Sequence, residues 1–338
     1  MRRKHRRIKK KRNELKEFLV DELEFEEDLP EDEATIKVEE RLQKIQELKT
    51  LIHADDEMGI PEIPPADDGL FGGDIILTTK QAQALIDEMK GRAKRSASIF
   101  FENDIFNSLW KMPIRYWVNS TEFKQDLQNV VHDLMNTITQ AVPCIRFQKD
   151  DAPLKSGSQI IFRLVPDSCG GRSPLGHQGI NEITLGIGEY CGVDVFNGTV
   201  LHETIHSLGG NHEQTRTDRD KYIEILWKNI EPRSSSNYEI YNESTSYGAP
   251  YDYKSIMHYS NGVFAIDSDA PTLKVLQGTV TELGGRTLTS NDIFQLKRMY
   301  CSPCKDTTSE CGTQALSGGC NQEQTRTQCP RSCGQCDQ

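Results

Sequence analysis

Residues 201–220 read LHETIHSLGGNHEQTRTDRD and place three histidines around a pair of glycines. His202 and His206 are four residues apart, so on a helix both imidazoles project from one face and can reach a single ion. Gly209 can adopt a left-handed conformation that ends the helix and brings His212 to the same ion from a new direction. Three imidazoles that leave one position open for water are typical of catalytic zinc. The stretch therefore predicts one Zn²⁺ cofactor.

Glu203 follows the first predicted ligand, so its carboxylate would stand beside the open zinc position as a general base. The alternative is an ordinary exposed helix end with three scattered histidines. The 338 residues contain eight histidines, and a glycine and a third histidine at fixed offsets make a chance match rare. The spacing therefore favours a metal-dependent hydrolytic site.

Further motifs extend this pattern. The stretch resembles the signature of the astacin metallopeptidases, a metzincin family, which continues past the third histidine with residues matched here by Glu213, Arg216, Asp218, Arg219 and Asp220. The sequence SIMHY, residues 255–259, resembles the Met-turn of the family, and residues 288–301 resemble its last helix and closing cysteine. The similarity spans residues 96–301. It departs from the family at Gly210, where an aromatic residue is usual.

The resemblance assigns roles to several side chains. It implies that Met257 lies beneath the metal. Tyr259 would ligate zinc or swing to stabilise the oxyanion. It also implies that an extended protein substrate adds as a strand along the sheet edge across the cleft.

The order of elements predicts an α+β fold. We expect a strand at 114–119, a helix at 123–142, strands at 144–148 and 159–165, and helices at 193–209 and 290–300. Thr289 or Ser290 would cap the last helix, with Asp292 in its first turn. The resemblance implies a metzincin-type domain at 96–301, with a twisted mixed sheet, helices and a zinc cleft between two subdomains.

Residues 1–95 are predicted to be a leader. A short helix capped by Thr78 or Thr79 should precede the basic tetrad Arg92, Ala93, Lys94 and Arg95, which suits a processing protease of the secretory pathway. The sequence FGGD, residues 71–74, resembles the Phe-x-Gly-Asp motif of astacin leaders. The resemblance implies that Asp74 occupies the zinc position that water needs. It also implies that the new ammonium at Ser96 binds Glu213 after cleavage.

Charge is unevenly distributed along this acidic chain. Residues 2–12 carry nine Lys or Arg, whereas residues 13–68 carry five basic and twenty acidic side chains. The overall net charge of −11 argues against nucleic acid as a partner. The basic run suits a nuclear or anionic-surface tag or a solvated, disordered segment, and we expect the disordered segment.

Cysteine use predicts secretion. Ten cysteines, an even number, all follow residue 143, which indicates disulfides made in an oxidising compartment. Asn119, Asn197 and Asn242 begin glycosylation sequons. No window offers a membrane span, and the charged start lacks the apolar region of a signal peptide. We therefore expect that the recorded start misses or replaces a signal sequence.

The tail, residues 304–336, holds six cysteines and is too small to fold without cross-links. Its terminal CxxxCxxC resembles a ShK toxin-type (ShKT) module, which we expect to serve as an accessory docking domain. The disulfides that the two resemblances imply are Cys144–Cys301, Cys169–Cys191, Cys304–Cys336, Cys311–Cys329 and Cys320–Cys333.

The motifs together predict a secreted zinc-dependent metalloendopeptidase. It would be made as a zymogen and would hydrolyse peptide bonds in protein and peptide substrates. The rival hypothesis is a catalytically inactive binding protein that acts through its ShKT tail. The intact Glu203 and the three intact histidines count against the rival.

Overall fold

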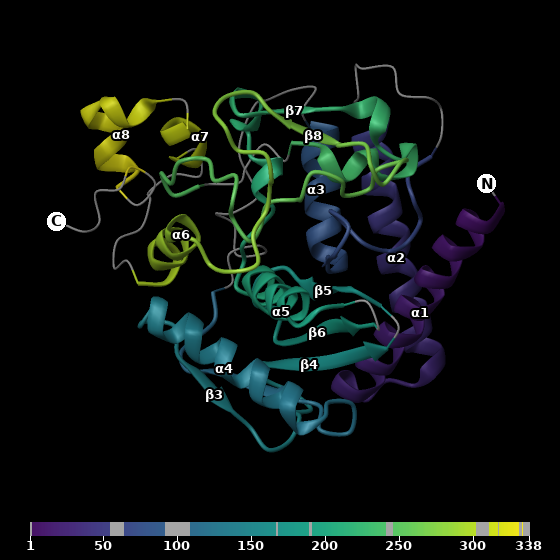
Figure 1. The fold of residues 1–338 in the computed structure, drawn as a ribbon. Coiled ribbons are helices and arrows are strands. Elements are labelled where there is room, and N and C mark those ends of the chain that lie inside the picture. The colour runs from purple at the N-terminus through teal and green to yellow at the C-terminus, as the bar shows by residue number, and fades with distance from the viewer. Residues whose placement is uncertain are drawn as a thin grey trace.

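The computed structural model contains a twisted mixed sheet with helices packed against it (Figure 1). It describes residues 2–54, 64–91, 109–166, 168–188, 191–240, 246–301, 311–316, 318–330 and 333. The strands are β1 (Ile75–Ile76), β2 (Ile114–Val118), β3 (Phe147–Lys149), β4 (Gln159–Pro166), β5 (Gly170–Pro174), β6 (Ile180–Ile187), β7 (Ile223–Ile225) and β8 (Leu273–Val275).

The main sheet has the strand order β1-β5-β6-β4-β2-β3. Strand β5 runs antiparallel to β6, whereas the other neighbours are parallel. Strands β7 and β8 form a separate antiparallel pair. The chain's α-helices are α1 (Arg2–Glu27), α2 (Glu31–Ala54), α3 (Thr79–Gly91), α4 (Gln125–Ala141), α5 (Val193–Ser207), α6 (Ser290–Tyr300), α7 (Cys311–Leu316) and α8 (Glu323–Gln328).

Short 3-10 turns occur in the part of the chain that follows α5. They are η1 (Glu213–Thr215), η2 (Arg219–Lys221), η3 (Trp227–Asn229), η4 (Pro232–Tyr238) and η5 (Gly319–Asn321).

The main core lies between one face of the sheet and helices α4 and α5. Helix α4 buries Val131, Met135 and Ile138, which share one helical face at spacings of four and three. They belong to one cluster with Ile183 and Leu185 of β6. Burial of each such side chain contributes about 1.5–3 kcal/mol, so this layer holds α4 firmly against the sheet.

Local signals account for the helix starts. Thr289 caps α6 in a reciprocal capping box with Asp292, as the sequence predicts. Thr78 and Gln81 form the same reciprocal pair before α3, with N···O distances of 2.9 and 3.1 Å. Strand β3 begins three residues later than predicted, and α5 ends at Ser207 rather than at residue 209.

The prediction of a disordered segment at residues 2–12 is wrong. Helix α1 includes this run, because Arg and Lys are good helix formers and an apolar stripe follows on the same helix. Leu15 and Leu19 of that stripe are fully buried among residues of α2. Arg12 forms ion pairs with Glu39 at 2.7 Å and Asp67 at 3.0 Å.

Residues 75–81 also contact the sheet directly. Strand β1 adds in parallel to the edge strand β5, with Ile75 opposite Ser173. The amide of Gln81 donates to the carbonyl of Leu175 at 3.0 Å. Within the described parts of the chain, none of the helices combines the length and the hydropathy that a bilayer span requires.

Helix α1 covers a carboxyl group on the sheet. Burial raises the pKa of Glu182 to about 8; Glu22 of α1 adds to the rise, Arg163 opposes it and Glu122 adds a further increase. Because the folded chain binds this proton more tightly than the unfolded chain, the stabilisation is complete below the ordinary pKa. It is lost as the pH rises toward about 8.

We therefore expect Glu182→Gln to reduce the fall in melting temperature of the full chain between pH 5 and pH 8. Thermal scans at several pH values would measure it. Glu224→Gln, an exposed carboxyl paired with Lys274, is the matched control and should leave the pH profile unchanged. An identical profile for the wild type and Glu182→Gln would contradict the prediction.

Candidate metal centre

Three imidazoles meet at the C-terminal end of α5. His202 and His206 lie one helical turn apart, with ring centroids separated by 4.6 Å. Gly209 has a φ of +103°, in the left-handed region, so the helix ends there and the chain turns back. The ring of His212 then lies 4.7 Å from that of His206. The structure thus brings together the three residues that the sequence singles out.

The carboxylate of Asp74 lies among these rings. Its oxygens are 3.4, 3.6 and 3.3 Å from the Nε2 atoms of His202, His206 and His212. Burial would raise the pKa of Asp74, but the charge of His212 and the nearby imidazoles of His202 and His206 hold that pKa well below its usual range. A charged carboxylate from the leader therefore faces all three Nε2 atoms.

Backbone carbonyls orient two of the rings. Nδ1 of His202 lies 2.8 Å from the carbonyl oxygen of Ile256, and Nδ1 of His206 lies 2.8 Å from that of Gly210. When each Nδ1–H donates to its carbonyl, Nε2 keeps its lone pair for a metal. Every residue has a backbone carbonyl, so the residue types at these two positions do not identify them as acceptors. The sequence therefore could not predict these hydrogen bonds.

The donor set fits the predicted zinc ion. Nε2 of His206 is buried and has no hydrogen-bond partner, as expected of an atom placed to bind a metal. Burial lowers the pKa of His206 to about 4, which keeps the ring neutral. One ligand atom from each of Asp74, His202, His206 and His212 lies within 4.8 Å of the others. Three histidine nitrogens this close to one another form a ligand set that suits zinc.

Glu203 is buried beside the histidines. Its Oε2 has no hydrogen-bond partner, and a Cβ added at Gly171 of β5 would lie 2.5 Å from its Cγ. Burial raises the pKa of Glu203 well above its ordinary value, and the negative charge of Asp74 raises it further. Gly171 therefore provides the space in which this carboxyl meets the sheet edge.

The segment 255–259 contacts the histidine site from another part of the chain. The carbonyl of Met257 accepts a hydrogen bond from the amide of Glu213 at 2.9 Å, which ties this segment to the chain after His212. The ring of Tyr259 lies 4.8 Å from that of His212, and its hydroxyl donates to the carbonyl of Gly72 in the leader. Tyr259 thus contacts both the histidine site and the leader.

Gly210 permits a close turn. A Cβ at this position would lie 2.4 Å from Cγ2 of Ile205, so a side chain would force the turn to shift. The amide of Gly210 donates to the carbonyl of Ile205 at 2.8 Å. The departure from the usual aromatic residue therefore belongs to a tighter contact between the turn and α5.

Comparison with known proteins identifies the family. The sequence model of the Astacin peptidase family matches residues 103–301. The chain belongs to the astacin family. A second model, the ShK domain-like family, matches residues 303–336. These matches confirm the two predicted resemblances.

Two relatives with similar sequences are named as zinc metalloproteinases. Zinc metalloproteinases nas-9 and nas-10 of Caenorhabditis elegans are each 35% identical to this astacin over 81% of its length. The chain spans only 54% of each of these two relatives. Among solved structures, high choriolytic enzyme 1, a hatching enzyme zinc-protease from Oryzias latipes (medaka fish), matches with a TM-score of 0.51 and 27% identity. That match covers 62% of this chain and 100% of the other.

The fold class is confirmed by this likeness, and the family together with the histidine cluster confirms the zinc cofactor. Among the described cysteines, the structure pairs Cys144–Cys301, Cys169–Cys191, Cys311–Cys329 and Cys320–Cys333. Cys304 and Cys336 lie outside the described residues.

The other predicted positions are distributed over the surface and the leader. Asn119 is half-buried, and its side-chain oxygen accepts from the amide of Thr121 at 3.1 Å. Asn197 lies on α5 with its side-chain oxygen buried, so this sequon is poorly placed for glycosylation of the folded chain. Arg92, Lys94, Arg95, Ser96 and Asn242 lie outside the described residues.

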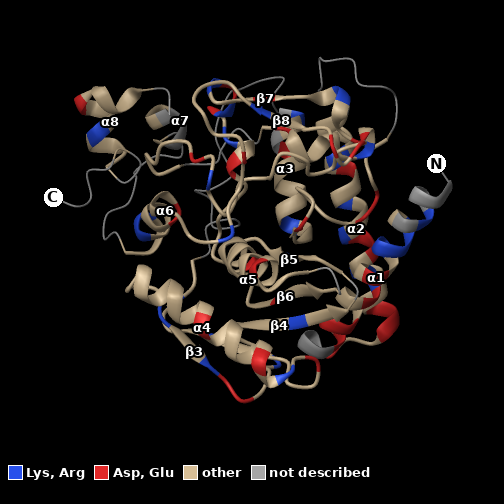
Figure 2. Cartoon of the chain, viewed as in Figure 1, with Lys and Arg blue, Asp and Glu red and all other residues tan. Residues whose placement is uncertain are grey.

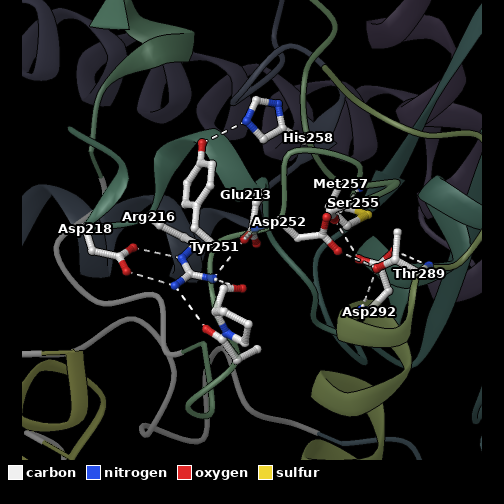
Figure 3. A network of polar contacts seen from close by, with 12 residues as sticks. Glu213, Arg216, Asp218, Tyr251, Asp252, Ser255, Met257, His258, Thr289 and Asp292 are labelled. Carbon is white, nitrogen blue, oxygen red and sulfur yellow. Dashed lines mark hydrogen bonds and ion pairs between the residues drawn. The ribbon is translucent and has the colours of Figure 1, made fainter. Parts of the chain in front are cut away.

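A polar network joins the turn after His212 to α6 (Figure 3). Glu213 accepts from Arg216 at 2.8 Å and from the amide of Asp252 at 2.9 Å. Asp252 in turn accepts from the hydroxyl of Thr289 at 2.6 Å. Asp218 forms an ion pair with Arg216. The short turn η2 begins at the next residue.

Asp292 anchors the network to the metal centre. It accepts from the Ser255 hydroxyl at 2.6 Å and from the Ile256 amide at 3.2 Å. The carbonyl of the same Ile256 orients His202. The sequence predicts Asp292 only as an acidic residue in the first turn of the last helix, and its contacts with Ser255 and Ile256 are not predicted, because they join segments more than thirty residues apart.

A cavity of about 30 Å³ lies beside Glu213, lined among others by Gly210, Asn211, Arg216 and Ser246. Burial raises the pKa of Glu213 to about 7, whereas Arg216 opposes the rise. A cation entering the cavity would therefore meet a buried carboxyl that is ready to ionise.

We expect Asp292→Asn to weaken zinc binding. The amide places donors against the Ser255 hydroxyl and the Ile256 amide, which should cost about 2 kcal/mol of folding stability. It should also lower zinc affinity about tenfold through the loosened ring of His202.

Urea unfolding and competition with a chelator would measure the two effects. Asp126→Asn, in the first turn of α4, is the matched control, because Asp126 is an exposed helix-start acid far along the chain from the histidines. Zinc affinity that falls no more in Asp292→Asn than in this control would contradict the prediction.

Proposed function

We propose that the chain is the precursor of a secreted zinc endopeptidase that hydrolyses peptide bonds in protein substrates. The observation that carries the proposal is the convergence of three imidazole Nε2 atoms on one carboxylate, with the unpaired Glu203 beside them. We assign residues 1–95 to the leader, 96–301 to the catalytic domain and 304–336 to the accessory domain.

His202, His206 and His212 would hold the ion. Zinc, when bound, lowers the pKa of water toward about 7 and polarises the scissile carbonyl. Glu203 takes the proton from the attacking water and later gives it to the leaving amine, so water adds across the broken C–N bond. Burial raises the pKa of Glu203 above its ordinary value, which suits a carboxyl that accepts a proton and later donates it.

Tyr259 and the sheet edge would act on the substrate. The phenol of Tyr259 can donate to the oxyanion once its present acceptor, the Gly72 carbonyl, leaves with the leader. Strand β5 offers its edge to an extended peptide where it now pairs with β1. Met257, on the turn next to the rings, would support the metal centre by packing.

Asp74 would keep the precursor inactive. A carboxylate on a short tether has a high effective concentration, so it can exclude water from the ion without great intrinsic affinity. Gly72 and Gly73, which have positive φ values, allow the chain to turn tightly there. Cleavage after Arg95 by a secretory processing protease would release this segment.

The new terminus would then find a partner inside the domain. The ammonium of Ser96 has an ordinary pKa near 8 and can bind Glu213, whose cavity lies beside the third histidine. The disulfides support secretion, with Asn119 and Asn242 as the remaining glycosylation candidates, and the ShKT tail would dock the enzyme on its substrates.

The decisive experiment is Glu203→Gln in the processed protein. We expect hydrolysis of a broad peptide mixture to fall by about a thousandfold or more, because the proton carrier is lost, while zinc content stays at one per chain. Mass spectrometry of the products and elemental analysis would measure these quantities.

Glu224→Gln is the control, since this exposed carboxyl on β7 forms its ion pair with Lys274 of β8 at 2.9 Å. Removal of zinc by a chelator should abolish hydrolysis in the wild type and in the control. A zinc-loaded but inert wild type would favour the binding-protein hypothesis.

The inactivity of the precursor can be tested in a chain that cannot be cleaved after Arg95. We expect Arg95→Gln alone to be inactive, and the addition of Asp74→Ala to raise peptide hydrolysis about tenfold or more, because water regains access to the ion. Asp87→Ala, which removes an exposed carboxyl of α3, serves as the matched leader control. Equal rates in the two double variants would refute the role of Asp74.

A further inference from the structure

A charged row crosses the outer face of the sheet, away from α4 and α5. Arg163 of β4, Thr184 of β6 and Arg172 of β5 are direct cross-strand neighbours, so their side chains share one face. Ile183 and Leu185 point the other way, into the core. The row therefore belongs to a surface distinct from the core, and we name Arg163, Thr184 and Arg172 the outer row.

Helix α1 of the leader covers this row. The ring of Phe18 lies 5.9 Å from the guanidinium carbon of Arg163 and 5.1 Å from that of Arg172. Glu14 and Glu22 stand four residues on either side of Phe18, on the same helical face, and both act on the charge of Arg172. Figure 2 shows the acidic stretch of α1 beside the sheet.

Two polar atoms of the outer row have no hydrogen-bond partner. Nε of Arg172 and Oγ1 of Thr184 are buried without a hydrogen-bond partner. Arg163, in contrast, is held by Glu122 at 2.8 Å and by Glu182 at 3.4 Å. A ligand that reaches Arg172 with a carboxylate therefore gains a charge-assisted bond that α1 leaves unmade.

We propose that the outer row is a docking site for protein substrates, which accepts a helical segment with an aromatic residue between two acids at four-residue spacing. This inference rests on the proposed function, because cleavage after Arg95 would detach α1 and uncover the row. A Cβ at Gly171, the residue before Arg172, would lie 2.5 Å from Cγ of Glu203, so a docked substrate would be bound one residue along β5 from the position that contacts Glu203.

The chemistry of the occupant follows from what covers the row now. The guanidinium groups of Arg163 and Arg172 both lie against the ring of Phe18. Because cations are attracted to the face of an aromatic ring, this pair favours an aromatic side chain over an aliphatic one. The cations then select carboxylates on both sides of that ring.

A binding experiment needs no catalysis. The full chain would be cleaved after Arg95 and freed of its leader, and the probe would be a fluorescent peptide of residues 11–25. We expect saturable binding, weakened about tenfold by Arg172→Gln and restored only in part by Arg172→Lys, which keeps the charge but loses the planar guanidinium group. Lys149→Gln, an exposed cation on β3, is the matched control and should bind as the wild type does.

The peptide itself provides a second control. A version with Phe18→Ala, or with both Glu14→Gln and Glu22→Gln, should bind about tenfold more weakly to the same protein. Absence of binding, or binding that ignores both Arg172→Gln and the peptide changes, would overturn the proposal.

A cleavage experiment tests the substrate itself. Two peptides would share one cleavable sequence, and only one would carry an appended Glu-x3-Phe-x3-Glu segment. We expect about a tenfold lower KM for the peptide with the segment, an unchanged kcat, and loss of the difference in Arg172→Gln. Equal KM values would overturn the docking site, whereas failure to cleave either peptide would refute the peptidase and leave the binding result to judge the docking site.

Discussion

The left-handed turn at Gly209 is the constraint on which the metal centre depends. Helix α5 can offer only two imidazoles to one point, because the next side chain on the same face lies a further turn along the helix axis, about 10 Å from the first, and is too far away to reach the same ion. A third ligand needs the chain to reverse within a few residues, and a φ of +103° makes that reversal possible for glycine at low cost. The close approach of Gly210 to Ile205 then fixes the direction in which His212 returns.

A second layer of contacts turns this geometry into a rigid site. The carbonyls of Gly210 and Ile256 hold two rings in the orientation that frees Nε2. The backbone of Ile256 is itself held by Asp292 at the start of α6, which accepts a hydrogen bond from the Ile256 amide. The histidines, the Met-turn and the last helix are therefore one connected unit, and Cys144–Cys301 ties the end of that helix to the sheet layer.

The described residues before residue 92 contact this unit at several places. Asp74 faces the imidazoles, β1 extends the edge of the sheet, and α1 lies over the outer row through Phe18. Each contact alone is modest, but one chain carries them all, so each raises the effective concentration of the others. Such an arrangement keeps Asp74 at the site without requiring a strong individual bond.

Residue type and spacing predicted the three histidines that the structure brings together and the helix cap at Thr289, because each of these patterns is local in the sequence. Asp74 was predicted only from the resemblance of residues 71–74 to a family motif, because its contact with the histidines joins distant segments. The same reasoning failed for residues 2–12, where charge density suggested disorder. The helix forms there because Leu15 and Leu19 bury against α2, and such a contact between distant segments leaves no mark on the run itself.

The sequence by itself determined the chemistry: three imidazoles, a neighbouring carboxylate and a glycine able to turn the chain. Only the tertiary structure decided which atoms satisfy those groups. The carbonyl partners of the histidines, the anchoring of Ile256 by Asp292 and the cover of α1 over Arg163 and Arg172 all join segments far apart in the chain. Backbone atoms are the same in every residue, so their roles emerge only when packing brings them within hydrogen-bonding distance.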